Sequence, residues 1–95
     1  MPHALITYKF VRAVSMTEVE GTLRLAQMGA SSLHGEDRVR LEAQCAVDRN
    51  ARVIEIDITT EVGRSLALIF GGYARREFGN EAVRMERRAT TGGVA

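Results

Sequence analysis

Hydrophobic and polar residues alternate at every second position in four segments of the chain, residues 4–14, 38–47, 52–58 and 82–88. In the first segment Ile6, Tyr8 and Phe10 share one face. A two-residue period is typical of β-strands with one buried face. Residues 48–50, between the second and third segments, are typical of a tight turn and predict a hairpin. The pattern therefore predicts four strands.

Two further segments carry hydrophobic residues at steps of three and four, the spacing of one face of an α-helix. The first predicted helix begins after Ser15 or Thr17, either of which can cap a helix N-terminus, and ends before Gly35. Its apolar stripe consists of Val19, Leu23, Ala26, Ala30 and Leu33. The second predicted helix begins at Thr59 or Thr60 and ends at about residue 78. The predicted order of elements is then βαββαβ.

The chain also carries an internal repeat. A shift of forty-three residues aligns residues 17–29 with residues 60–72, and six of these thirteen positions are identical. Two similar βαβ halves predict the ferredoxin-like fold, a four-stranded antiparallel sheet with two helices on one face. Right-handed crossovers place the first and third strands in the middle of that sheet. We therefore predict one α+β domain over residues 1–88 and a flexible tail over residues 89–95.

The repeat allows the two predicted helices to be compared. Small residues recur on one flank, where Gly29 of the first helix matches Gly72 of the second, so we expect the helices to meet there. The other flank is polar on the first helix and apolar on the second. The apolar strip of the second helix consists of Gly63, Ala67, Phe70, Ala74 and Phe78.

This apolar strip has two interpretations. It can be a wide core face, covered by the loop after the first helix or by the C-terminal tail. It can also be the contact surface of a homodimer centred on Phe70, where small neighbours let a partner helix come close. We take the homodimer as the working prediction.

Composition narrows the classes of function. The net charge is +1, from thirteen basic and twelve acidic residues, so there is no general attraction to nucleic acid or to membranes. The longest uncharged apolar run, residues 66–74, is much shorter than the ~20 residues that cross a bilayer. Cys45 is the single cysteine, and the N-terminus has no signal-peptide pattern. A cytoplasmic location is therefore expected.

Paired carboxylates are the first candidates for chemistry. Glu55 and Asp57 share one face of the third predicted strand, and such pairs can bind a metal or act as acid and base. However, Lys9 lies on the same face of the neighbouring strand, and Arg40 and Arg84 fall on the predicted edge strands. We therefore expect ion pairs across the sheet instead of a catalytic site.

The remaining candidates are weaker, so no catalytic, metal-binding or cofactor-binding residue is predicted. The soft metal ligands are His3, His34 and Cys45, which do not have the spacing of a metal site. Residues 59–65 form the start of a helix, a place where anions bind. They match no phosphate-binding motif, and Glu61 would repel a phosphate.

The leading hypothesis is a non-catalytic homodimeric interaction or regulatory module. An alternative is a small-molecule binder or enzyme similar to the dimeric α+β barrels, in which two sheets enclose a pocket. RNA binding is a further alternative because the fold pattern resembles that of RNA-recognition motifs, which expose aromatic residues on central strands. Here Tyr8 and Phe10 fall on the face predicted to be covered by helices. The basic residues that could contact RNA are Arg75, Arg76, Arg84, Arg87 and Arg88.

Overall fold

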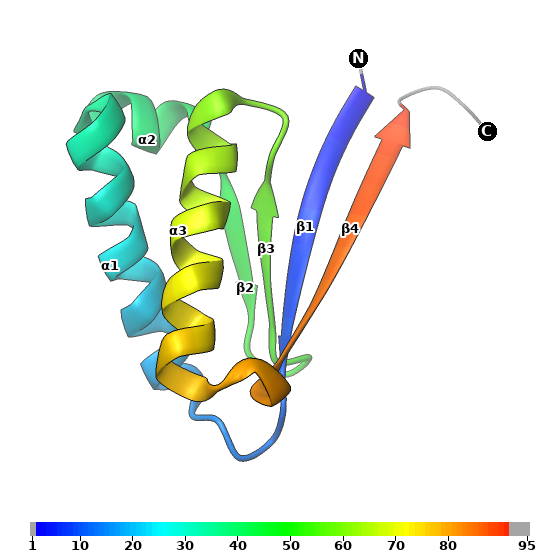
Figure 1. Cartoon of the computed structure of the whole chain (residues 1–95). Helices are drawn as coiled ribbons and strands as arrows, with labels where there is room; N and C mark the ends of the chain where they lie inside the picture. Colours follow the sequence, from blue (N-terminus) through cyan, green and yellow to red (C-terminus); the bar gives the residue numbers. More distant parts are fainter. Residues whose placement is uncertain (1, 92–95) are drawn as a thin grey trace.

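The computed structural model describes residues 2–91, which form one α+β unit of four strands and three α-helices (Figure 1). The elements in chain order are β1 (Pro2–Phe10), α1 (Met16–His34), α2 (Glu36–Glu42), β2 (Cys45–Asp48), β3 (Val53–Asp57), α3 (Glu61–Phe78), the 3-10 turn η1 (Asn80–Ala82) and β4 (Val83–Thr91). The strands form one antiparallel sheet in the order β2-β3-β1-β4. The first and third strands are therefore central, as predicted.

The helices cover the sheet unevenly. Figure 1 shows α1 and α3 side by side on one face of the sheet, with α1 on the side away from β4. No described helix lies beyond α3 on the β4 side. Met85, on the helix side of β4, is therefore 42% exposed although it is a large hydrophobic residue. This uncovered margin is the part of the fold that forms the candidate site.

The largest difference from the sequence prediction lies in residues 38–47, which were expected to form one strand. Residues 38–42 belong to the helix α2, and only Cys45–Asp48 pair with β3. Val39 and Ala43, four residues apart, are buried, whereas Leu41 between them is 71% exposed. Arg38 and Glu42 form an i,i+4 ion pair at 3.1 Å. A short apolar segment fits both the two-residue period of a strand and the 3.6-residue period of a helix. Here the burial of Val39 and Ala43, one helical turn apart, decides for the helix.

The ends of the two long helices follow the expected chemistry. Ser15 caps α1 by accepting a hydrogen bond from the Glu18 amide, and Thr60 caps α3 by accepting one from the Gly63 amide at 2.9 Å. Both helices end at glycines with φ of 93°, Gly35 and Gly79, a backbone conformation that other residues rarely adopt. β4 continues to Thr91, three residues past the predicted end, and residues 92–95 of the predicted tail lie outside the described residues.

The core lies between the helices and the sheet. Tyr8 and Phe10 of β1 point toward the helices, as predicted, and their rings pack edge to face against Phe70 of α3, with centroid distances of 5.0 and 6.2 Å. Ile54 and Ile56 of β3 are fully buried beside them. Edge-to-face pairs of this kind add to the free energy gained from burial alone. The central strands and α3 therefore form the aromatic part of the core.

The prediction that Gly29 and Gly72 lie where the two long helices meet is correct for Gly29 of α1 and wrong for Gly72 of α3. A Cβ added at Gly29 of α1 would lie 3.5 Å from Ile69 and 3.5 Å from Tyr73, so this glycine faces α3. Gly72, its repeat equivalent, has no side-chain neighbour within 4 Å, and Leu68 is 79% exposed. The two helices therefore do not contact each other through equivalent flanks. On α3, the contact uses the Ile69 and Tyr73 side.

Candidate functional site

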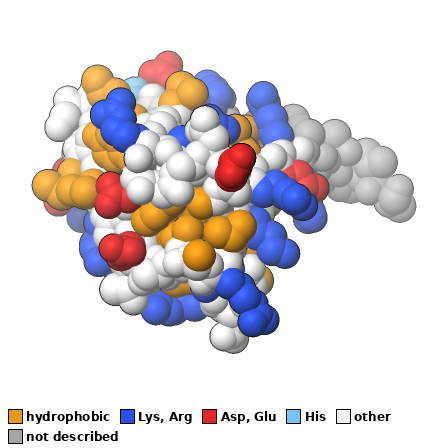
Figure 2. All heavy atoms as spheres, turned by 60° about the horizontal axis from the view of Figure 1, so that its bottom comes forward, with side chains coloured by type: hydrophobic (Ala, Val, Ile, Leu, Met, Phe, Trp, Pro, Cys, Tyr) orange, Lys and Arg blue, Asp and Glu red, His pale blue; other side chains and the backbone are white. Residues whose placement is uncertain are grey.

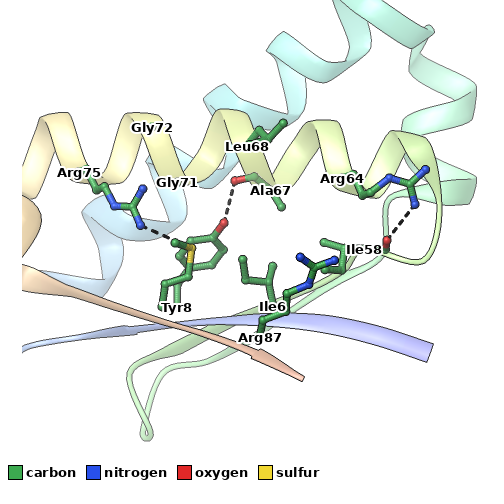
Figure 3. Close-up of a pocket in the computed structure, with 11 residues that line it drawn as sticks. Ile6, Tyr8, Ile58, Arg64, Ala67, Leu68, Gly71, Gly72, Arg75 and Arg87 are labelled. Carbon is green, nitrogen blue, oxygen red and sulfur yellow. Dashed lines mark hydrogen bonds between the residues drawn. The ribbon is translucent and has the colours of Figure 1, made fainter. Parts of the chain in front are cut away.

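A groove with a cavity volume of about 310 Å³ runs between α3 and β4 (Figure 3). Its floor is formed by Ile6, Tyr8 and Ile58, and its lining is predominantly apolar. Leu68 on α3 and Met85 on β4 also line the groove. The volume lies at the lower end of the ~300–1,000 Å³ that is typical of small-molecule sites.

Small residues on α3 make room for this groove. A Cβ at Gly71 would lie 3.1 Å from the Tyr8 hydroxyl oxygen, so glycine lets the Tyr8 ring lie directly under the helix. The hydroxyl donates a hydrogen bond of 2.8 Å to the carbonyl of Ala67, as Figure 3 shows. Gly72 adds an open position at the rim because nothing occupies the space where its Cβ would be. The sequence Gly71-Gly72 thus combines one glycine in close contact with Tyr8 with one whose missing side chain leaves the rim open.

Three arginines border the apolar floor: Arg64, Arg75 and Arg87. Arg64 donates to the carbonyls of Ile58 and Thr59, and Arg75 donates to the Met85 sulfur at 3.6 Å. No ion pair within 4.0 Å links any of the three to an acidic group in the described part of the chain.

Figure 3 shows the Arg87 side chain rising from β4 toward α3, close to Ile6. Arg64 and Arg75 are eleven residues apart on α3, which corresponds to about 16 Å along the helix axis. The groove is therefore elongated and has positive charge along its length. Guanidinium groups beside an apolar surface are well suited to bind carboxylates or phosphates, because they donate several hydrogen bonds in a fixed geometry.

Tyr8 is the groove residue whose ionisation is most affected. Burial raises the pKa of its phenol to about 12, and the positive charge of Arg75 opposes this effect more weakly. The phenol is therefore a neutral hydrogen-bond donor near neutral pH and is poorly suited to exchange protons with a substrate. The groove lining contains no histidine, cysteine or carboxylate among the described residues.

The apolar strip that was predicted as a partner contact lies in the chain's own core. Its five residues are Gly63, Ala67, Phe70, Ala74 and Phe78, of which only Phe78 is partly exposed. Tyr8 and Phe10 of β1 contact the Phe70 ring, and Gly63 lies against the end of β3. A partner helix could not reach Phe70, which is 0% exposed, in this structure. The comparison of the helices identified an apolar strip correctly, but its covering element is the sheet.

Gly63 has a separate structural reason for being small. A Cβ at this position would lie 2.0 Å from the backbone carbonyl oxygen of Asp57 at the end of β3. The first turn of α3 therefore packs directly against the strand end, and glycine is needed there for close approach.

Within the described strands, the register does not place Lys9 opposite an acidic residue, as the predicted ion pairs on the open face of the sheet would require. Lys9 lies opposite Val53 on one side and opposite Arg84 on the other, a pair of like charges. Asp57 accepts a hydrogen bond of 2.8 Å from the Thr59 amide, so it helps to form the turn into α3. Arg40 is not on an edge strand, because it lies in α2 and pairs with Asp37 at 2.8 Å.

The candidate metal ligands are separated in the fold. His34 ends α1, and its Nε2 lies 2.9 Å from the Ser65 hydroxyl, while the Cys45 sulfur accepts a hydrogen bond from Gln27. Burial raises the pKa of the Cys45 thiol, which makes it less reactive. His3 falls in β1. Within the described residues there is no cluster of three or more histidine, cysteine or acidic side chains that could hold a metal ion.

The start of α3, which the sequence did not favour as an anion site, makes hydrogen bonds within the chain itself. The Thr60 hydroxyl donates to the Glu42 carbonyl at 2.7 Å and accepts from the Gly63 amide. The Arg64 guanidinium is turned toward the carbonyls of Ile58 and Thr59. These contacts use the groups that an anion would need.

The basic residues near the C-terminus do not form one patch. Arg87 lies on the helix side of β4, whereas Arg84 and Arg88 lie on the open side. Figure 2 shows one face of the molecule, where basic side chains are scattered around a central hydrophobic cluster and interrupted by acidic ones. This distribution does not favour the continuous basic surface that follows a nucleic-acid backbone.

Comparison with other proteins adds no functional information. No protein-family model matches the chain, and no curated protein matches it in sequence. None of the helices that the structure describes has the length and apolar character required to cross a membrane. The groove is therefore the feature of the described residues that bears on function.

The groove residues were not identified as a site from the sequence, although one indication was present. Arg87 follows Val83 and Met85 at the positions of β4 that face the helices. A charged residue at an inward position indicates that the helices do not cover this end of the strand. The meeting of α3 with β4, however, depends on the tertiary arrangement.

Proposed function

We propose that this protein is a small, non-catalytic binding module that holds an elongated apolar molecule with an anionic head in the groove between α3 and β4. The observation that carries the proposal is an apolar groove of about 310 Å³ bordered by Arg64, Arg75 and Arg87. An apolar floor favours the body of such a ligand, and guanidinium groups favour its head. The proposal retains the regulatory or interaction role that the sequence suggested.

Within this proposal, the anionic head is placed near Arg75 and Arg87. Arg64 already donates two hydrogen bonds to backbone carbonyls, whereas the hydrogen bond from Arg75 goes to a sulfur, which is a weak acceptor. A carboxylate would therefore be a better partner for Arg75 than its present one.

We also assign the arrangement to the ferredoxin-like class, with α2 as an additional helix between α1 and β2. The strand order and the two long helices on one face support this assignment. The single Cys45 supports a reducing compartment such as the cytoplasm.

The alternative of a barrel-like enzyme is less well supported. Its pocket would need an apolar open face of the sheet. Lys9, Arg84, Glu86 and Arg88 are exposed charged residues on that face. Burying them against a second sheet would cost free energy that unpaired charges do not recover.

The test is calorimetric titration of the protein with three ten-carbon probes, decanoate, decanol and decylammonium. Decanoate is expected to bind most tightly, and its addition should shift the backbone amide NMR signals of Gly71 and Gly72. Arg87→Gln should weaken decanoate binding about tenfold or more, because a charge-assisted hydrogen bond contributes roughly 1.5–3 kcal/mol. Arg76→Gln is the matched control, since Arg76 is an exposed arginine of α3 that does not line the groove.

A second pair of variants tests the place of binding. Gly72→Leu should fill the groove rim and reduce decanoate binding, whereas Gly21→Leu on α1 should not, although a Cβ meets no atom within 4 Å at either position. If decanol binds as tightly as decanoate, the proposed preference for an anionic head is wrong. If none of the probes shifts the signals of Gly71 or Gly72, the groove is not the binding site.

A further inference from the structure

β4 forms one edge of the sheet, and no described strand pairs with its outer side. The strand has nine residues, which corresponds to about 30 Å of extended backbone. The opposite edge, β2, has only four residues. Figure 1 shows β4 as the outermost element on its side of the molecule. A long edge strand with free N–H and C=O groups is a template for another strand.

The charges on β4 distinguish between the possible partners and registers. Arg84, Glu86 and Arg88 lie on the open face of the sheet, while Met85 and Arg87 lie on the helix side. If two copies pair antiparallel about a two-fold axis, residues at equal distances from the axis face each other. An axis at Glu86 would oppose two glutamates and would place Arg84 against Arg88, which is unfavourable on both counts.

An axis at Arg87 gives a different result. Glu86 of each copy then lies opposite Arg88 of the other, which makes two ion pairs on the open face. All nine residues from Val83 to Thr91 find a partner, so neither strand overhangs. An axis at Met85 also pairs opposite charges, Arg84 with Glu86, but only five residues of β4 overlap.

We infer that this protein forms a homodimer by antiparallel pairing of β4 with β4 of a second copy, with the two-fold axis at Arg87. The two four-stranded sheets then become one continuous sheet. On the open face, the charges that keep this edge from pairing with unrelated strands are complementary in this full-length register, whereas the two Arg87 side chains meet as like charges on the helix side.

The register also brings the two ligand grooves together. Arg87 of each copy lies on the helix side of the sheet, beside the other at the axis. The repulsion between the two Arg87 side chains opposes dimer formation. An anionic head bound near them lowers this repulsion. Decanoate should therefore strengthen the dimer, a consequence that rests on the proposed function.

The decisive experiment is a charge exchange measured by sedimentation equilibrium without ligand. The wild-type mass should approach 21 kDa, twice the 10.5 kDa of one chain. Glu86→Arg and Arg88→Glu should each raise the dimer dissociation constant by about tenfold, because each variant turns two attractive pairs into repulsive ones. The double variant Glu86→Arg/Arg88→Glu should restore the wild-type value. Both side chains are exposed, so the variants should fold.

Disulfide trapping tests the register in a Cys45→Ser background. Arg87→Cys should form a covalent dimer readily, since opposed Cβ atoms in a sheet are about 5 Å apart. Arg84→Cys is the control, because its two copies would lie about 20 Å apart. The proposal is overturned if the wild-type chain is monomeric at high micromolar concentration, if the double variant does not recover, or if Arg84→Cys is trapped as fast as Arg87→Cys. Ligand titration of a monomeric variant would still test the groove independently.

Discussion

The close approach of α3 to β3 at Gly63 leads to the sharpest prediction of stability. In Gly63→Ala the new Cβ would lie 2.0 Å from the carbonyl oxygen of Asp57, whereas real Cβ contacts are essentially never shorter than 3.0 Å. Both sides of this contact are held, because the Gly63 amide is bonded to Thr60 and the Asp57 amide is bonded to the Gln44 carbonyl at 2.9 Å. To relieve the clash between the new Cβ and the Asp57 carbonyl oxygen, the backbone itself would have to move by about 1 Å.

Two effects of opposite sign determine the magnitude. Replacing glycine by alanine in a helix adds up to about 1 kcal/mol of stability. Overpacking in a tightly packed site costs roughly 1–3 kcal/mol and sometimes more, and a backbone clash belongs at the upper end of that range. We expect Gly63→Ala to lower the free energy of unfolding by about 2 kcal/mol, with a fall in Tm of about 10 °C.

Gly72→Ala is the matched control, since it is the same substitution in the same helix with no atom within 4 Å of the new Cβ. It should raise the free energy of unfolding by about 0.5–1 kcal/mol. Urea denaturation followed by far-ultraviolet circular dichroism measures both variants, because the chain has no tryptophan for fluorescence. Equal stability of the two variants would refute the close approach at Gly63.

Four further variants test the core, α2 and the buried phenol. Phe70→Ala should lower the free energy of unfolding by about 3–5 kcal/mol at any protein concentration, since the ring is fully buried within one chain; a loss that appears only on dilution would indicate an intermolecular contact. Val39→Ala should lower thermal stability measurably while Leu41→Glu leaves it nearly unchanged, and the reverse order would contradict α2. Because the pKa of Tyr8 is raised from 10.0 to about 12 in the folded state, the unfolded chain loses its phenol proton first, and stability should fall as the pH rises from 10 toward 12. Tyr8→Phe should lose the hydrogen bond to Ala67, at a cost of about 1 kcal/mol, together with this pH dependence, which denaturation at a series of pH values would reveal.

Local chemistry in the sequence determined most of the secondary structure. The threonine and serine caps, the glycines after each helix and the two-residue period of the central strands each act through neighbouring backbone groups, so they can be recognised without the fold. The inward face of β1 was also predicted correctly, because Tyr8 and Phe10 can be buried only on one side of a strand. Residues 38–42 were the exception, since a short apolar segment fits a helix and a strand equally well until something packs against it.

Only the tertiary structure decided the role of the apolar strip on α3. The sequence alone identified Gly63, Ala67, Phe70, Ala74 and Phe78 as one strip that differs from the first helix, and it left the covering surface open. The position of α3 over β1 and β3 buries these residues within the chain and leaves the margin toward β4 uncovered. Periodicity shows which residues share a face, but the choice of which surface covers that face depends on how the elements pack together. For this reason the arginine-bordered groove could be found only once the sheet and helices were in place.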